Sequence, residues 1–66
     1  MSRRRKVVAR ALERLEMERR RSMGAWQRAH AAGDEAKAVA AEARHKRALM
    51  NIETKEAELA AIDQEP

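Results

Sequence analysis

Two groups of cationic side chains are the most chemically distinctive feature of this sequence of 66 residues. One group follows the N-terminus, and the other forms a belt halfway along the expected helical structure. Guanidinium and ammonium groups gathered in this way favour phosphate oxygens, because each contact neutralises backbone charge and releases counterions. The predicted nucleic-acid-binding residues are Arg3, Arg4, Arg5 and Lys6 in the first group and Arg19, Arg20, Arg21, Arg44, Lys46 and Arg47 in the second.

The belt has two other interpretations. It is an ordinary solvated face if Glu16, Glu18 and Glu42, the acids nearest to it, neutralise part of its charge. It could also bind an acidic protein surface. The net charge of +4 and the separate basic segment favour nucleic acid over an acidic protein. No helix-turn-helix spacing or aromatic stacking platform accompanies the cations, so we expect contacts with the phosphate backbone and little sequence readout.

Residues for catalysis or metal binding are sparse. The chain has no cysteine, which excludes a thiolate nucleophile, a disulfide framework and a zinc finger. His30 and Asp34 are four residues apart, but a turn separates them and no third ligand is evident, while a pH switch at His45 has no support. No Ser–His–Asp set, glycine-rich phosphate loop or buried carboxylate pair can be assembled. We therefore expect a non-enzymatic protein without a cofactor, a metal or a small-molecule substrate.

The composition favours helices over disorder. Val, Leu and Ile supply only nine residues, which would fit a disordered chain. However, Ala, Glu, Lys, Leu and Arg make up 43 of the 66 residues, and the single Pro is the last residue. These residues lose little conformational freedom in a helix, and such a share is typical of coiled coils and long helices.

A break near the middle of the chain predicts two helices. Gly33 can adopt the left-handed conformation that ends a helix, and Asp34 can cap the next one. We expect helix 1 to continue through Gly24 because the apolar spacing does. The predicted fold is all-α, a two-helix antiparallel hairpin resembling a coiled coil. Its expected parts are a flexible basic arm (1–6), helix 1 (about 7–31), a turn (32–34), helix 2 (about 35–63) and a tail (64–66).

Apolar spacing indicates how the helices pack. In helix 1, alternating steps of four and three residues connect Val8, Leu12, Leu15, Arg19, Ser22, Trp26 and Ala29. Helix 2 offers a stripe of small residues, Ala36, Ala40 and Ala43, and one of larger residues, Leu49, Ile52, Leu59 and Ile62. Two helices that pack through these stripes form only a narrow core. We therefore expect a homodimer that forms a four-helix bundle. The expected partner or dimer interface contains Leu12, Leu15, Trp26, Leu49, Ile52 and Leu59.

Opposite charges on the two halves support the antiparallel arrangement. Residues 1–33 carry ten Lys or Arg and three acids, whereas residues 34–66 carry five Lys or Arg and eight acids. A turn near Gly33 places residues side by side when their numbers add to about 66, so the basic start lies along the acidic end. Such exposed pairs each contribute less than about 1 kcal/mol, but they select the antiparallel arrangement.

These observations predict a small binding protein that associates with nucleic acid through its basic belt. The alternative is a protein-interaction module, such as an adaptor, an inhibitor or a small subunit of a larger assembly like those of phages or bacteria, with Trp26 as its anchor. A third hypothesis is a coiled-coil spacer. No apolar run approaches the length of a membrane span, and we expect a cytoplasmic protein without membrane contact.

Overall fold

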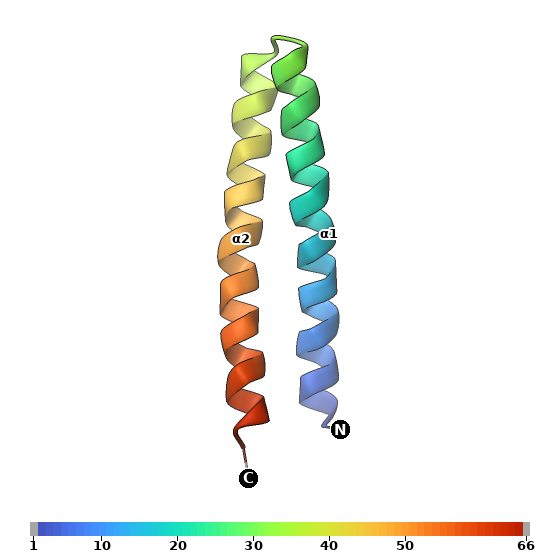
Figure 1. Ribbon diagram of the computed structural model, residues 1–66, viewed down its shortest axis with the longest axis vertical. Helices are drawn as coiled ribbons and strands as arrows, with labels where there is room; N and C mark the ends of the chain where they lie inside the picture. The colour runs from blue at the N-terminus through green and yellow to red at the C-terminus, as the bar shows by residue number, and fades with distance from the viewer. Residues whose placement is uncertain (1, 66) are drawn as a thin grey trace.

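A computed structural model describes residues 2–65 and shows two long helices that lie side by side (Figure 1). Helix α1 runs from Arg3–Ala31 and helix α2 from Glu35–Asp63. They are antiparallel, with the turn at one end and both termini at the other. The Cα atoms extend over 52 × 14 × 11 Å. The predicted all-α hairpin is confirmed, and its pairing into a four-helix bundle stays a prediction.

The turn has the chemistry that the sequence predicted. Gly33 has a φ of 72°, a left-handed conformation that costs glycine little because it has no Cβ. The Asp34 N–H donates to the Ala29 carbonyl oxygen at 2.9 Å, which satisfies one of the free carbonyl groups at the end of α1. The Asp34 carboxylate accepts a hydrogen bond from the Lys37 N–H at 3.1 Å and so caps α2.

Helix α1 begins earlier than the sequence predicted, at Arg3 instead of near residue 7. Three arginines in a first turn oppose the helix dipole, which favours fraying of the helix start. Two features offset this cost. The Ser2 hydroxyl accepts a hydrogen bond from the Arg5 N–H at 3.1 Å, and acids at the end of α2 pair with Arg4 and Arg5. The described part of the predicted arm therefore belongs mostly to α1; residues 1 and 66 lie outside the described residues.

Helix α1 continues through Gly24 without a break, as predicted. An interior glycine costs about 1 kcal/mol relative to alanine in a helix. Here the Arg28 side chain folds back over this position, and a Cβ on Gly24 would lie 3.3 Å from its Nη1 atom. The glycine thus gives the Arg28 guanidinium room beside the helix backbone.

The seam predicted for α1 faces α2. Val8, Ser22 and Ala29 are buried, and the intervening seam residues Leu12, Leu15, Arg19 and Trp26 are half-buried. In α2, the inward row contains Ile52, Leu59 and Ile62 from the predicted stripe of larger residues, and its other members were not predicted. Its members, again in alternating steps of three and four, are Ala38, Ala41, His45, Ala48, Ile52, Lys55, Leu59 and Ile62.

The small-residue stripe predicted for the contact in α2 was wrong. Ala36, Ala40 and Ala43 are all exposed. Their row continues along the helix through Arg47 and Thr54, whereas the inward row contains two isoleucines and a leucine. Both rows contain alanines, but burial of the inward row removes more apolar surface from water. The inward row therefore packs against α1. Leu49, which the prediction placed in the larger stripe, is 42% exposed.

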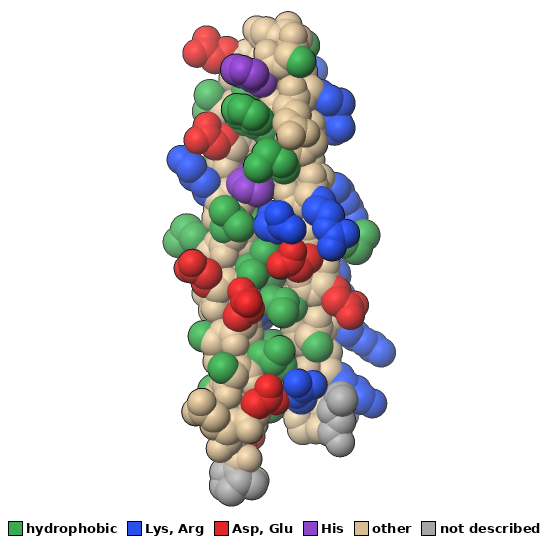
Figure 2. Space-filling model, viewed as in Figure 1, with side chains coloured by type: hydrophobic (Ala, Val, Ile, Leu, Met, Phe, Trp, Pro, Cys, Tyr) green, Lys and Arg blue, Asp and Glu red, His purple; other side chains and the backbone are tan. Residues whose placement is uncertain are grey.

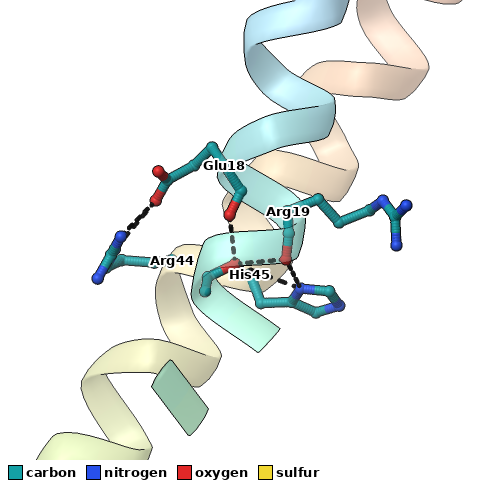
Figure 3. A network of polar contacts seen from close by, with 5 residues as sticks. Glu18, Arg19, Arg44 and His45 are labelled. Carbon is teal, nitrogen blue, oxygen red and sulfur yellow. Dashed lines mark hydrogen bonds and ion pairs between the residues drawn. The ribbon is translucent and has the colours of Figure 1, made fainter. Parts of the chain in front are cut away.

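A polar layer interrupts the seam at mid-length (Figure 3). Ser22 is fully buried, and its hydroxyl donates to the Glu18 carbonyl oxygen at 2.8 Å. The His45 Nδ1 atom lies 3.2 Å from the Arg19 carbonyl oxygen and 3.4 Å from the Ser22 hydroxyl. This polar layer favours one register, because a slip would separate the half-buried His45 ring from its partners on α1, the Arg19 carbonyl oxygen and the Ser22 hydroxyl. The observed pairing agrees with the predicted register, in which paired residue numbers add to about 66.

The ion pair at the open end gives the hairpin a specific pH dependence. Arg5 donates from Nε to Asp63 at 2.7 Å, and this hydrogen bond, with a smaller coulombic contribution, holds the pKa of Asp63 below its ordinary value. Because the pKa of Asp63 is lower in the folded state, its ionised carboxylate stabilises the fold at pH values above the unfolded pKa of about 4. This contribution is lost as the pH falls through the folded pKa.

We predict that Asp63→Asn lowers the urea midpoint at pH 7 and that the difference from the unmodified chain is smaller at pH 3, below the unfolded pKa of about 4. Urea titrations followed by circular dichroism at the two pH values measure it. Glu53→Gln is the control, because no described cation lies within 4.0 Å of Glu53. A difference that stays constant with pH would contradict the assignment.

Candidate nucleic-acid interface

Ion pairing divides the cations of residues 2–65 into two sets. Seven cations lie within 4.0 Å of an acid: Arg4, Arg5, Arg19, Lys37, Arg44, Lys46 and Lys55. The other eight have no acid that close among the described residues: Arg3, Lys6, Arg10, Arg14, Arg20, Arg21, Arg28 and Arg47. All of the second set except Arg47 belong to α1. The unneutralised charge is therefore concentrated on one helix.

The predicted belt is only half neutralised. Arg19 pairs with Glu16 at 3.0 Å and Lys46 with Glu42 at 3.2 Å. Arg44 reaches across the hairpin and donates to Glu18 at 2.8 Å (Figure 3). Arg20, Arg21 and Arg47 keep their charge unpaired among residues 2–65. Exposed pairs of this kind are weak, so phosphate can compete with the acids for the paired cations as well.

Three arginines form a straight row along α1. Arg14, Arg21 and Arg28 are spaced by seven residues, so they occupy the same side of the helix at intervals of about 10.5 Å. Arg14 and Arg28 each line a groove between the helices, and Arg21 lies exposed between them. The row extends over about 21 Å.

Cations of α2 border the same grooves. Arg28 shares a groove of about 440 Å³ near the turn with Lys37 and Arg44. Arg14 shares a groove of about 470 Å³ with Lys55. Arg47 lies seven residues from Ala40 and from Thr54, which line the two grooves. We call this surface the basic face; it consists of Arg14, Arg21 and Arg28 from α1 and Lys37, Arg44, Arg47 and Lys55 from α2.

The groove near the turn has a floor of small side chains. Apart from its cations and Asp34, it is lined only by alanines: Ala25, Ala29, Ala32, Ala40 and Ala41. Because methyl groups fill little space, the long side chains at its rim stand above the floor and can approach an extended anionic backbone. Asp34 is the one acid lining this groove, and it is engaged in capping α2.

The N-terminal cations adjoin the basic face. Arg3 and Arg4 line a third groove together with Lys55 and Glu58, so this cluster continues the row toward the open end of the hairpin. Arg4 pairs with Glu65 at 2.7 Å. Lys6 and Arg10 are exposed and unpaired among the described residues. The sequence prediction named the N-terminal cations but missed Arg10, Arg14 and Arg28, although the seven-residue repeat of Arg14, Arg21 and Arg28 was a readable signal.

The opposite face has a different character. Figure 2 shows hydrophobic side chains along the middle of this face, with two histidines near them, while Lys and Arg line the outer edge of α1. Met23, Trp26, Glu42 and His45 line a groove of about 200 Å³ there. Trp26 is half-buried, and its ring stacks on His30 with a centroid distance of 4.9 Å.

The predicted interface residues divide between the core and the surface. Ile52 is buried in the hairpin seam, and Leu12, Leu15 and Leu59 are half-buried in it. Leu49 and Trp26 retain exposed surface, and they lie outside the basic face. Leu49 is exposed and Trp26 lines a groove, so these two are the predicted interface residues best placed to contact a partner.

The described residues contain neither a metal-ligand cluster nor a membrane span. Among residues 2–65, no three His, Asp or Glu side chains gather closely enough to hold a metal ion. Neither described helix combines the length and apolar character that a membrane span requires. Comparisons of the chain with protein-family models, with curated proteins and with solved structures find no match.

Proposed function

We propose that this chain is a small non-enzymatic binding protein whose basic face contacts the phosphate backbone of a nucleic acid. The observation that carries the proposal is the row of unpaired arginines on α1. Unpaired like charges repel one another and destabilise the free hairpin, and an anionic partner removes that repulsion. Arginine suits this role because its planar guanidinium donates two parallel hydrogen bonds to a phosphate.

The dimensions of the row fit an extended anionic backbone. Arg14, Arg21 and Arg28 extend over about 21 Å along α1. B-DNA carries one charge per about 1.7 Å of its axis, so such a length offers many phosphates. Trp26, the only aromatic residue, faces away from the basic face, so base stacking contributes little and recognition depends on charge and shape.

We also propose that two copies associate into a four-helix bundle. The seam of a single hairpin contains many small or polar residues, among them Ser22, Ala41 and Ala48, and apolar side chains remain exposed outside it. A two-helix unit buries only one side of each apolar stripe, and a second hairpin covers more of it.

Fluorescence anisotropy with a labelled duplex tests the nucleic-acid proposal. With about five phosphate contacts, the logarithm of the affinity should fall with the logarithm of salt at a slope of about −4.5, which is roughly 500-fold between 50 and 200 mM. Binding that is absent at 50 mM salt, or that does not change with salt, would overturn the proposal. Duplex DNA and duplex RNA of the same sequence distinguish the preferred backbone.

A second candidate is a protein-interaction module. The groove beside Trp26 favours it, because Met23 and Leu49 near that groove are 39% and 42% exposed. A lone tryptophan in such a position often carries much of the binding energy of an interface. Capture of one stoichiometric protein partner, lost on Trp26→Ala and retained on charge reversal of the basic face, would support this candidate over the first.

A further inference from the structure

The face opposite the basic face has an apolar centre. We call it the tryptophan face; it consists of Met23, Trp26, Glu42 and His45, which line one groove, and of their neighbours at seven-residue spacing, Glu16, His30, Leu49, Glu56 and Asp63. Met23 and Leu49 expose large hydrophobic side chains on it. Hydrophobic groups continue between the two helices for much of the length of this face (Figure 2).

Most of the charge on the tryptophan face is neutralised within the chain; of its four acids, only Glu56 has no cation within 4.0 Å among the described residues. Three ion pairs lie along it: Arg5 with Asp63, Arg19 with Glu16, and Lys46 with Glu42. The basic face, by contrast, contains four unpaired arginines among the described residues. Two copies with a net charge of +4 each therefore repel least when their tryptophan faces meet. The same neutrality gives a nucleic acid or a strongly acidic protein little reason to bind there.

The available area matches that of a stable dimer. A face that extends 52 × 14 Å between Cα atoms has a footprint of roughly 700 Å² per copy, or about 1,400 Å² for both, within the usual range of specific interfaces. Exposed Met23 and Leu49 and half-buried Trp26 would form its centre, and the ion pairs would form a polar rim.

We propose that a second copy of this chain packs on the tryptophan face, and that the resulting dimer links two separate nucleic-acid segments. When two hairpins meet through their tryptophan faces, their basic faces point in opposite directions. Layers of packed helices are about 10 Å apart, so the two basic faces lie on opposite sides of a bundle only two helices thick. One duplex cannot contact both faces without wrapping around the bundle, whereas two duplexes can. The bridging part of this inference depends on the proposed binding to nucleic acid.

The dimer interface can be tested with two adjacent residues. Leu49→Glu places a charge within the proposed interface and should weaken dimerisation by about 100-fold or more, because burying an unpaired charge is costly. Met50→Glu is the matched control, because Met50 is 67% exposed and lies outside the tryptophan face; it should change the dimer dissociation constant less than about threefold. Sedimentation equilibrium measures association, and circular dichroism verifies that both variants keep their helices. A monomeric unmodified chain, or equal effects of the two variants, would overturn the assignment.

Cysteine cross-linking gives a second readout that does not depend on stability. The chain has no cysteine, so a single one can be introduced without background. Under oxidation, Leu49→Cys or Met23→Cys should give disulfide-linked dimers in high yield, whereas Met50→Cys should not. Cross-linking through Met50→Cys alone would place the interface on the outer side of α2 and overturn the proposal.

Bridging is measured by capture of one duplex by another. A biotinylated duplex on beads should retain a free fluorescent duplex when the unmodified chain is added, and Leu49→Glu should abolish this retention while a single duplex still binds in anisotropy. Retention that persists in the monomeric variant would overturn the bridging inference. Because anisotropy detects binding to one duplex, failure of bridging alone is distinguishable from failure of the proposed function.

Discussion

Replacing Arg14, Arg21 and Arg28 together with glutamine is expected to reduce the affinity for duplex nucleic acid at 50 mM salt by about 100-fold or more. The three side chains form the row along α1, and none of them has an acid within 4.0 Å among residues 2–65. Each lost phosphate contact should reduce the steepness of the salt dependence by about 0.9, so the slope should fall by about 2.7. Anisotropy titrations at several salt concentrations measure both quantities.

The matched control removes the same charge from another place. Arg5, Arg19 and Lys46 lie outside the basic face, and each pairs with an acid of the tryptophan face. Their joint replacement with glutamine lowers the net charge by the same amount but should weaken binding by less than about tenfold, because no side chain of the basic face is removed. Equal losses from the two triple variants would show that total charge, and not the basic face, determines binding.

Replacing Ile52 with alanine is expected to produce the largest loss of stability. Ile52 is 7% exposed and is one of the few large apolar side chains in the seam of α2. Such a truncation in a core costs about 2–5 kcal/mol, which is a large share of the stability of so small a domain. Urea titration followed by far-UV circular dichroism should show a much lower midpoint. Val39→Ala is the control, because Val39 is 60% exposed and alanine is the better helix former, so an equal midpoint for both variants would contradict the described core.

The turn and the pairing of the helices were predictable because local chemistry determines them. In an alanine-rich chain, a glycine that tolerates positive φ followed by a carboxylate that caps the next helix predicts a turn between two helices. The register followed from the position of that turn. The start of α1 was placed too late, although the sequence predicted that the basic start lies along the acidic end, because the stabilisation from the pairs of Arg4 and Arg5 with Glu65 and Asp63 was not weighed against the helix dipole.

The full inward row of α2 could not be identified from the sequence because of its composition. Alanines lie on both sides of this helix, and hydrophobicity alone cannot distinguish Ala36 and Ala43 from Ala38 and Ala41. His45 and Lys55 occupy two positions of the inward row, which makes it look polar in the sequence. His45 is tolerated there because the Arg19 carbonyl oxygen and the Ser22 hydroxyl lie within hydrogen-bond distance of its ring.

The candidate interface was predicted from the density of cations along the sequence. The structure adds which cations are paired with acids and which share one side of a helix. Charge density along the sequence identified Arg20, Arg21 and Arg47, but it could not show that Glu18 reaches Arg44 across the hairpin. Spacing matters as much as density, because isolated arginines such as Arg14 and Arg28 join one surface only when the helix aligns them. Binding to nucleic acid therefore stays a proposal, and the residues proposed to contact phosphate now include Arg14 and Arg28.

The positive φ of Gly33 favours a turn at this position over one continuous helix. A Cβ at this position would meet no atom within 4 Å, so only the backbone conformation, and not space, disfavours other residues there. A residue that avoids the left-handed region would favour one continuous helix across residues 32–34. Both seams would then be filled by a second chain, in an extended domain-swapped dimer. The conformation of Gly33 thus favours a hairpin in which α1 and α2 of one chain pack against each other.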